Sequence, residues 1–331
     1  MPKEQTHWIL AREAFRRLKD GEARRIIAQN PNLYLLGAVI PDTPMYALEN
    51  TEEFDLLAHF LHGKDGENTF APLTGLVEAY QDKWSDGMWA FVMGTFSHIL
   101  ADAVYHPWVE YYTGSSTEVP DEWKDLSLTR HRELETYLDL FHLRMNGSRE
   151  RPISFFSLLK RKEMDAAAFD HMVGALYFSG AAKANNGVRK ALYAHGAIQW
   201  LFMQKSLARL SWFINRSTEG KGDKFLTLFY PYKEPRRPDY FQAGLKYRHT
   251  VTGRPKQGTV EELACKAAKV TARMFELVEK HLEQGTVRDF FQRIKGPSLE
   301  TGLVGVPVTA IVHYDLFVEM DRVLNVFRAI K

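Results

Sequence analysis

The stretch FVMGTFSHILADAVYH, residues 91–106, decides the fold of this chain. It reads as a single helix in which His98, Asp102 and His106 follow one another at intervals of four residues. Because a helix turns by about 100° per residue, positions four apart lie on one face, each one turn above the last. The other positions are apolar or small, which is typical of a buried helix. Ionisable groups buried in this way must be paired or must bind metal, because bare buried charge is too costly.

The length of this column bears on the number of metal ions. His98 and His106 are about 12 Å apart along the helix axis, at ~1.5 Å per residue. Zinc holds its nitrogen ligands at about 2.0–2.1 Å, so the two histidines should serve different ions. Asp102 lies between them and has two oxygens that could bridge ions on either side. The alternative is that all three are ordinary core residues, each with its own hydrogen bonds.

Composition limits the class of protein. The chain has 331 residues, 45% of them hydrophobic and 25% charged, as in soluble globular proteins. Its net charge of +2 does not point to a polyanionic partner, and its single cysteine, Cys265, excludes an intrachain disulfide. The apolar run at residues 33–40 is far too short for a membrane span. The first residues, MPKEQTHW, contain no apolar signal segment, so we expect a cytoplasmic protein.

Two further candidate ligands precede the column. Residues 6–19 have the pattern of an amphipathic helix with His7 in its first turn. The apolar run at residues 32–40 is followed by PDTP, whose prolines break a helix. Asp42 lies in that break, where its carboxylate can point back into the body of the protein. Taken alone, either residue could equally be a capping or turn residue.

Two other predicted helices supply the remaining candidates. In TEEFDLLAHFLHG, we favour His59 beside the apolar stripe as the ligand and keep His62, three residues later, in reserve. The helix LTRHRELETYLDLFHLRM contains His131 and Glu135, which are four apart and therefore on one face. Such a pair suits half of a zinc site, and it is also a common surface ion pair.

The rest of the chain is read mainly as helix. Pro107 should end the central helix soon after the column. From residue 153 the chain reads as core helices, in which His171 and His195 are interpreted as ordinary core or surface histidines. Residues 216–258 are basic, aromatic and rich in Gly and Pro, so we predict a long loop or lid. This segment could contact phosphate or lipid headgroups, or it could be a solvated connection.

The C-terminal residues predict more helices. Thr259 and Glu262 form a capping box that opens a helix reaching about His281, and further helices are expected at residues 289–294 and 308–330. No stretch alternates as a strand does, so we predict an all-α fold. It would have a multi-helix body at 1–215, the loop or lid at 216–258 and C-terminal helices at 259–331 packed on the same body.

The combined pattern resembles the zinc-dependent phospholipase C family, whose fold is shared by the P1-type nucleases. The matching pieces cover residues 6–140 in the order of the family: the early His7, GAVIPD ending in Asp42, AHF with His59, GTFSHILADAVYHP with the column, and HRELE with His131 and Glu135. The resemblance implies a helical bundle that holds two or three zinc ions.

The resemblance also implies how the ligands divide. One ion would be held by Asp42, His59, His98 and Asp102, and a second by His106, His131 and Glu135. Asp102 would bridge to a third ion that His7 also binds, and Asp42 would be a candidate general base. Secreted members of the family use the free amine of their mature N-terminal residue on this third ion, whereas six residues precede His7 here.

The chemistry of such sites suggests a function. Zinc lowers the pKa of bound water towards neutrality and neutralises charge on phosphoryl oxygens. The leading hypothesis is therefore a phospholipase C-like phosphodiesterase that uses metal-bound hydroxide on phosphate esters or phospholipid headgroups. One alternative is a P1-like nuclease for single strands, which needs aromatic stacking platforms such as Trp84, Trp89, Trp108 or Trp123. The other is a metal-binding structural or interaction protein, whose sites would be closed to water.

Overall fold

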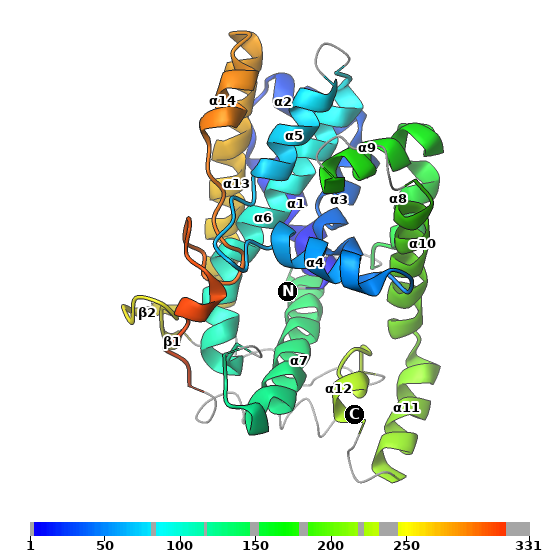
Figure 1. The fold of residues 1–331 in the computed structure, drawn as a ribbon, viewed down its shortest axis with the longest axis vertical. Helices are drawn as coiled ribbons and strands as arrows, with labels where there is room; N and C mark the ends of the chain where they lie inside the picture. Colours follow the sequence, from blue (N-terminus) through cyan, green and yellow to red (C-terminus); the bar gives the residue numbers. More distant parts are fainter. Residues whose placement is uncertain are drawn as a thin grey trace.

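The computed structural model describes residues 3–80, 84–115, 118–145, 152–178, 185–217, 222–231 and 244–315. Helices dominate these residues, which confirms the predicted all-α fold (Figure 1). The first half contains α1 (Glu4–Arg17), α2 (Glu22–Gln29), α3 (Pro31–Gly37), the 3-10 helix η1 (Ile40–Tyr46), α4 (Thr51–Leu61), α5 (Ala71–Tyr80), α6 (Asp86–Thr113) and α7 (Asp121–Met145). The second half contains α8 (Phe155–Arg161), α9 (Ala166–Phe178), α10 (Asn185–Phe202), α11 (Lys205–Ser217), α12 (Asp223–Leu226), β1 (Leu245–Arg248), β2 (Pro255–Gly258), α13 (Val260–Glu283), α14 (Val287–Arg293) and the 3-10 helix η3 (Val308–Ala310).

Helix α6, which contains the column, is the centre of the bundle. Ser85 caps its N-terminus by accepting from the backbone N–H of Met88, and the helix ends at Gly114, whose φ of 71° suits glycine. Helices α1, α2, α3, α7 and α13 pack against it. Among the described residues, α6 is the one helix long and apolar enough to cross a membrane, but 89% of that apolar window is buried inside the protein. Its place in the core therefore accounts for its composition.

The prediction that Pro107 soon ends this helix is wrong, because α6 runs well past it. A proline inside a helix leaves the carbonyl four residues earlier without its N–H donor. Here that carbonyl belongs to Ala103, and the backbone of Gly302 packs against it: a Cβ on Gly302 would lie 2.4 Å from the oxygen. The additional turns extend the ligand face of α6 to Glu110, four residues beyond His106.

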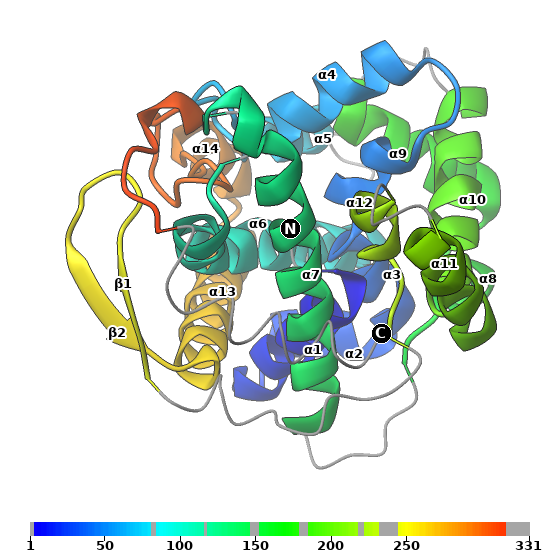
Figure 2. The ribbon, with the colours of Figure 1, turned by 90° about the horizontal axis from the view of Figure 1, so that it is seen from below.

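Two hydrophobic clusters hold the other helices around α6. The larger cluster surrounds its N-terminal half and includes Trp8, Phe91 and Phe96. The smaller lies where its C-terminal half meets α7 and α13, and includes Tyr105 and Leu138. Seen from below, α7 lies between α13 with the hairpin on one side and α10 with α11 on the other (Figure 2). The ligand face of α6 spans the junction between the two clusters.

Helix α3 approaches α6 so closely that only glycine fits at the crossing. A Cβ on Gly94 of α6 would lie 2.0 Å from the carbonyl oxygen of Tyr34, and a Cβ on Gly37 would lie 2.2 Å from the carbonyl oxygen of Phe91. Both obstacles are backbone atoms, which cannot swing aside as a side chain can. This contact matters for the site because α3 leads directly into η1, which contains Asp42.

We expect Gly94→Ala to lower the free energy of unfolding by about 3 kcal/mol or more, at the upper end of what overpacking a core costs. Gly174→Ala in α9 is the matched control, because nothing lies within 4 Å of the Cβ it would add. That substitution should be neutral or stabilise the helix by up to ~1 kcal/mol. Chemical denaturation of the two variants measures the difference, and equal midpoints would contradict the close packing of α3 on α6.

The second half departs from the sequence prediction in two places. Inside the predicted loop or lid, α12 is a short helix and β1 and β2 pair as an antiparallel hairpin, while residues 218–221 and 232–243 lie outside the described part. Residues 308–315 form η3 and irregular chain rather than the start of a helix, and 316–331 lie outside the described residues. The capping box of Thr259 and Glu262 is confirmed at the start of α13. The domain boundaries remain predictions.

A buried histidine of α7 makes the fold sensitive to acid. His142 is 2% exposed and shares a hydrogen bond of 2.9 Å with the hydroxyl of Tyr105. Burial lowers the pKa of His142 to about 4. The unfolded chain therefore binds a proton at higher pH than the native protein does, and stability is lost as the pH falls from about 6.5 towards 4.

We expect wild-type protein, freed of metal, to lose about 2 kcal/mol more stability than His142→Gln when the pH falls from 7.5 to 5. Glutamine can still hydrogen-bond to Tyr105 but has no group that titrates in this range. Urea denaturation of both proteins at the two pH values measures the difference. Parallel losses in the two proteins would show that His142 does not titrate as its burial predicts.

Candidate metal centre

The three column residues of α6 lie in the interior of the protein. His98, Asp102 and His106 are each 0% exposed. The Nε2 atom of His98 is 3.2 Å from Oδ2 of Asp102, and the Nε2 atom of His106 is 3.9 Å from Oδ1 of the same residue. Asp102 thus presents one oxygen to each histidine, as its position in the middle of the column predicts.

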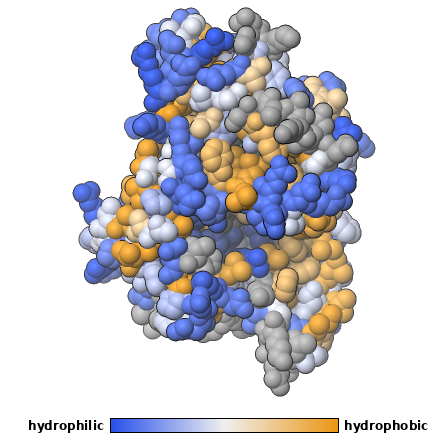
Figure 3. Space-filling view, in the orientation of Figure 1, coloured by the Kyte–Doolittle hydropathy of each residue, from blue (hydrophilic) through white to orange (hydrophobic). Residues whose placement is uncertain are grey.

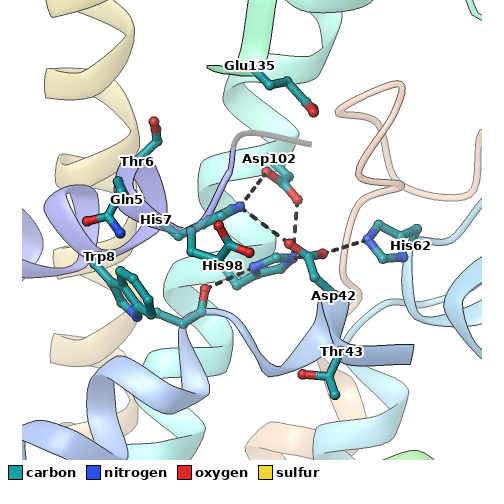
Figure 4. Close-up of polar contacts among 12 residues, drawn as sticks. Gln5, Thr6, His7, Trp8, Asp42, Thr43, His62, His98, Asp102 and Glu135 are labelled. Atoms are coloured by element: carbon teal, nitrogen blue, oxygen red, sulfur yellow. Dashed lines mark hydrogen bonds and ion pairs between the residues drawn. The ribbon is translucent and has the colours of Figure 1, made fainter. Parts of the chain in front are cut away.

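A first cluster forms where η1 and the end of α4 meet this column. Its members are Asp42, His62, His98 and Asp102, whose potential ligand atoms all lie within 4.8 Å of one another (Figure 4). The PDTP sequence, residues 41–44, lies within η1, and Asp42 is buried there. Oδ1 of Asp42 lies 3.2 Å from Nε2 of His62 and 3.2 Å from Nε2 of His98.

The structure corrects the choice between the two histidines of α4. The side chain of His59 is 39% exposed, and its Nδ1 lies 3.5 Å from Asp65 on the surface. His62 is 0% exposed and belongs to the first cluster. The sequence contains the reason: Phe54, Ala58 and His62 are spaced four apart, so His62 continues the buried face, whereas His59 is turned away from Ala58 by about 100°.

His7 reaches the edge of the first cluster from α1. Asp139 of α7 accepts hydrogen bonds from the backbone N–H groups of Gln5 and Thr6, at 3.2 and 2.7 Å, which fixes the first turn of α1. Nε2 of His7 then lies 3.4 Å from Oδ1 of Asp102, and its ring stacks on that of His98 at 4.1 Å. A third ion between His7 and Asp102 remains a prediction.

A second cluster consists of His106, His131 and Glu135, the set expected from the resemblance. Nε2 of His131 is 2.8 Å from Oε1 of Glu135. Two residues that the sequence analysis missed lie behind it: Glu110 is 3.3 Å from Nδ1 of His131, and Glu300 is 2.9 Å from Nδ1 of His106. The four-residue spacing from His106 could have identified Glu110, but nothing in the local sequence singles out Glu300.

Several buried atoms of the two clusters and of His7 have no hydrogen-bond partner. They are both ring nitrogens of His7, Nε2 of His98, both oxygens of Asp102 and Nε2 of His106. An unsatisfied buried polar atom costs about 1–3 kcal/mol, so such a concentration needs an explanation. Neutral imidazole nitrogens and carboxylate oxygens are the donor atoms that zinc takes in proteins. The residues therefore fit divalent metal ions, zinc in particular.

Charge in the first cluster also favours a cation. Burial would lower the pKa of His98, but the charges of Asp42 and Asp102 outweigh it and raise that pKa to about 10. Burial would raise the pKa of Asp102, yet the neighbouring histidines, His7 foremost, lower it to about 2. Burial and the charge of His98 lower the pKa of His7 to about 4. His98 also outweighs burial at Asp42 and lowers the pKa of that carboxyl, so the first cluster contains two ionised carboxylates, which favour a bound cation.

The two glutamates behind the second cluster differ in charge. Burial and the charge of Glu300 raise the pKa of Glu110 well above its usual value. Burial would raise the pKa of Glu300 too, but His106 outweighs it and holds that pKa well below the usual value. Glu300 is therefore the more acidic of the two side chains and Glu110 the less acidic.

Both clusters border one cavity of about 400 Å³. Asp42 of the first cluster and His131 and Glu135 of the second line it. The surface is hollowed near the middle of the face that contains α4 and α7 (Figure 3). A molecule entering this cavity can approach Asp42 of the first cluster and His131 and Glu135 of the second at once.

The other two histidines are ordinary, as predicted. His171 lies exposed on α9. His195 is buried with both ring nitrogens paired: Nδ1 is 2.9 Å from the hydroxyl of Thr43, and Nε2 is 3.2 Å from Oε1 of Glu4. Neither belongs to a metal-ligand cluster among the described residues.

A helical bundle that buries two such clusters beside a cavity defines a class of metal-dependent helical proteins. Comparison with known families identifies it more closely: zinc-dependent phospholipase C matches residues 6–187, more than half of the chain, and the protein belongs to this family. The match includes all residues of both clusters and Glu110, whereas Glu300 lies outside it. No curated protein and no solved structure matches the chain.

Proposed function

We propose that the protein is a zinc-dependent phosphodiesterase of the phospholipase C type, which hydrolyses the phosphate ester of a phospholipid or of a related small molecule. The observation that supports this most directly is the meeting of the two ligand clusters at Asp102, beside a cavity that both clusters border. Sites that only stabilise a fold are usually closed by four protein ligands, whereas catalytic sites keep an open position.

The residues divide into roles. The first cluster would hold one zinc ion and the second cluster another, with Asp102 between them. Bound zinc supplies a Lewis acid that neutralises charge on phosphoryl oxygens and makes water more acidic. Asp42 is the carboxylate of the first cluster that lines the cavity, so it is placed to accept a proton from water that enters there.

The rest of the cavity wall suits an amphiphilic phosphate ester. Lys3, Lys64 and Arg132 line it and supply positive charge for a phosphate group. Leu128 and Phe202 also line it and offer apolar surface to the remainder of the molecule. A phospholipid combines these two requirements in one molecule.

The nuclease alternative receives less support from the structure. Trp89 and Trp108 are buried, at 6% and 1% exposure, and Trp84 stacks on Trp89 at 4.3 Å. None of the four tryptophans near the motifs lines the cavity. This supports packing roles for Trp84, Trp89 and Trp108 over a role as platforms on which bases could stack.

Metal analysis combined with a substrate panel tests the proposal. After reconstitution with zinc, we expect at least two ions per chain and hydrolysis of phosphodiester lipids. A chelator should abolish the activity and zinc should restore it. The panel includes phosphomonoesters, soluble phosphodiesters, single-stranded nucleic acid and phospholipid vesicles. One ion or none after reconstitution, or no hydrolysis of any phosphodiester, would overturn the proposal, and preferential cleavage of nucleic acid would favour the nuclease.

A further inference from the structure

Glu300 reaches the second cluster from a part of the chain outside the family match. It lies in the turn between α14 and η3 and is 8% exposed. Its Oε2 is 2.9 Å from Nδ1 of His106, which lies 194 residues earlier in the chain. This is the ring nitrogen of His106 that faces away from Asp102, since Nε2 is the atom near Asp102.

Backbone contacts on both sides of Glu300 hold this turn in place. The N–H of Leu299 donates to the carbonyl of His62 at 2.9 Å, and the N–H of Val308 donates to the carbonyl of Lys64 at 2.7 Å. Gly302 packs against the Ala103 carbonyl, which Pro107 leaves without a helical donor. The turn is thus attached to the residues that follow α4 and to the middle of α6, and both places adjoin the clusters.

The four histidines of the two clusters share one arrangement. Each directs Nε2 to the interior of its cluster and has an acceptor behind Nδ1. The acceptor is a backbone carbonyl in the first cluster, Ala58 for His62 at 2.5 Å and Ala38 for His98 at 3.0 Å. Since a carbonyl only accepts, Nδ1 must be protonated there, and the lone pair of the neutral ring is on Nε2.

In the second cluster carboxylates replace these carbonyls. Glu300 lies 2.9 Å from Nδ1 of His106, and Glu110 lies 3.3 Å from Nδ1 of His131. A carboxylate behind a metal-binding imidazole fixes its tautomer and ring orientation and makes the other nitrogen a stronger donor to the metal. Such a partner is needed most where the backbone offers no acceptor.

We propose that Glu300 is a positioning residue for the second zinc site: it holds His106 with Nε2 directed at the ion, and its partner Glu110 does the same for His131. The inference rests on the second zinc site of the proposed function. Glu300 does not itself bind the ion, because it lies on the Nδ1 side of His106. The C-terminal part of the chain thereby completes a site whose ligands all come from the family region.

Zinc affinity, measured by competition with a chromophoric chelator, tests this independently of activity. We expect Glu300→Ala to bind the second zinc ion about 10–100-fold more weakly than wild type and to bind the first with unchanged affinity. Glu300→Gln should bind it more tightly than Glu300→Ala, because the amide oxygen can accept from His106 while the amide N–H donates to Glu110. Glu276→Ala, which removes an exposed glutamate of α13, is the control and should bind zinc as wild type does.

The outcomes separate this inference from the proposed function. Two zinc ions bound with wild-type affinity by Glu300→Ala would overturn the role of Glu300 and leave the function standing. Equal loss of zinc affinity in Glu300→Ala and Glu300→Gln would also overturn it. The negative charge of Glu300, and not its ability to accept a hydrogen bond from His106, would then determine zinc binding. A wild-type protein that binds only one zinc ion would overturn both. Circular dichroism of the zinc-free proteins checks folding; should Glu300→Ala not fold, Glu110→Ala tests the same pair from the other side and should weaken the same ion.

Discussion

Asp102→Asn should lower phosphodiesterase turnover by about 100-fold or more, at the strong end of what altering a metal environment does. Asp102 is the carboxylate between the two clusters: Oδ2 is 3.2 Å from Nε2 of His98, and Oδ1 is 3.9 Å from Nε2 of His106. Its pKa is lowered to about 2 by the histidines around it, in spite of burial, so it is ionised at neutral pH. Asparagine has the same shape but lacks the charge and directs an N–H₂ group where a ligand oxygen stood.

Turnover at saturating zinc, zinc content and helical content by circular dichroism measure this effect together. Helical content should stay the same, because α6 is held by its apolar sides. His171→Ala is the control, since that residue lies exposed on α9, and it should keep wild-type turnover. Normal zinc content and normal turnover in Asp102→Asn would show that the His98, Asp102 and His106 column has only a structural role. The interpretation as a non-catalytic metal-binding protein would then be favoured.

Regular helix geometry explains why the column could be predicted. The rotation per residue is nearly constant, so four-residue spacing places His98, Asp102 and His106 on one face without knowledge of the rest of the fold. The same rule correctly pairs His131 with Glu135 on α7. Applied consistently, it would also have favoured His62 and identified Glu110, since each lies four residues from another position on its face.

Features that depend on tertiary contacts could not be read from the sequence in this way. A proline usually ends a helix, but α6 continues past Pro107, and Gly302 packs against the Ala103 carbonyl, which the proline leaves without a donor. Glu300 is near His106 only because its turn is attached to the residues after α4. The sequence indicates the hairpin of β1 and β2 only weakly. Leu245 and Tyr247, which are buried in the structure, occupy alternate positions of a basic segment.

His62→Ala should reduce the zinc content of the protein from two ions per chain to one, whereas His59→Ala should leave it unchanged. The two histidines are three residues apart at the C-terminal end of α4, so each variant is a matched control for the other. His62 is fully buried with Nε2 3.2 Å from Asp42, while His59 is 39% exposed beside Asp65. Without His62 the first cluster loses one of its two imidazole ligands, and one of the two carboxylates that remain, Asp102, also lies near His106 of the second cluster, so the first ion should be held too weakly to stay bound.

Which of the two sites loses its ion in His62→Ala shows to which cluster His62 belongs. His62 belongs to the first cluster alone, so the second ion, held by His106, His131 and Glu135, should remain bound in His62→Ala. Turnover should fall with the lost ion, because a phosphate ester in the cavity would meet only one Lewis acid. Elemental analysis after gel filtration, with turnover measured on the same samples, tests both statements. Full zinc content in His62→Ala, or a lost ion in His59→Ala, would refute the assignment of His62 to the first site.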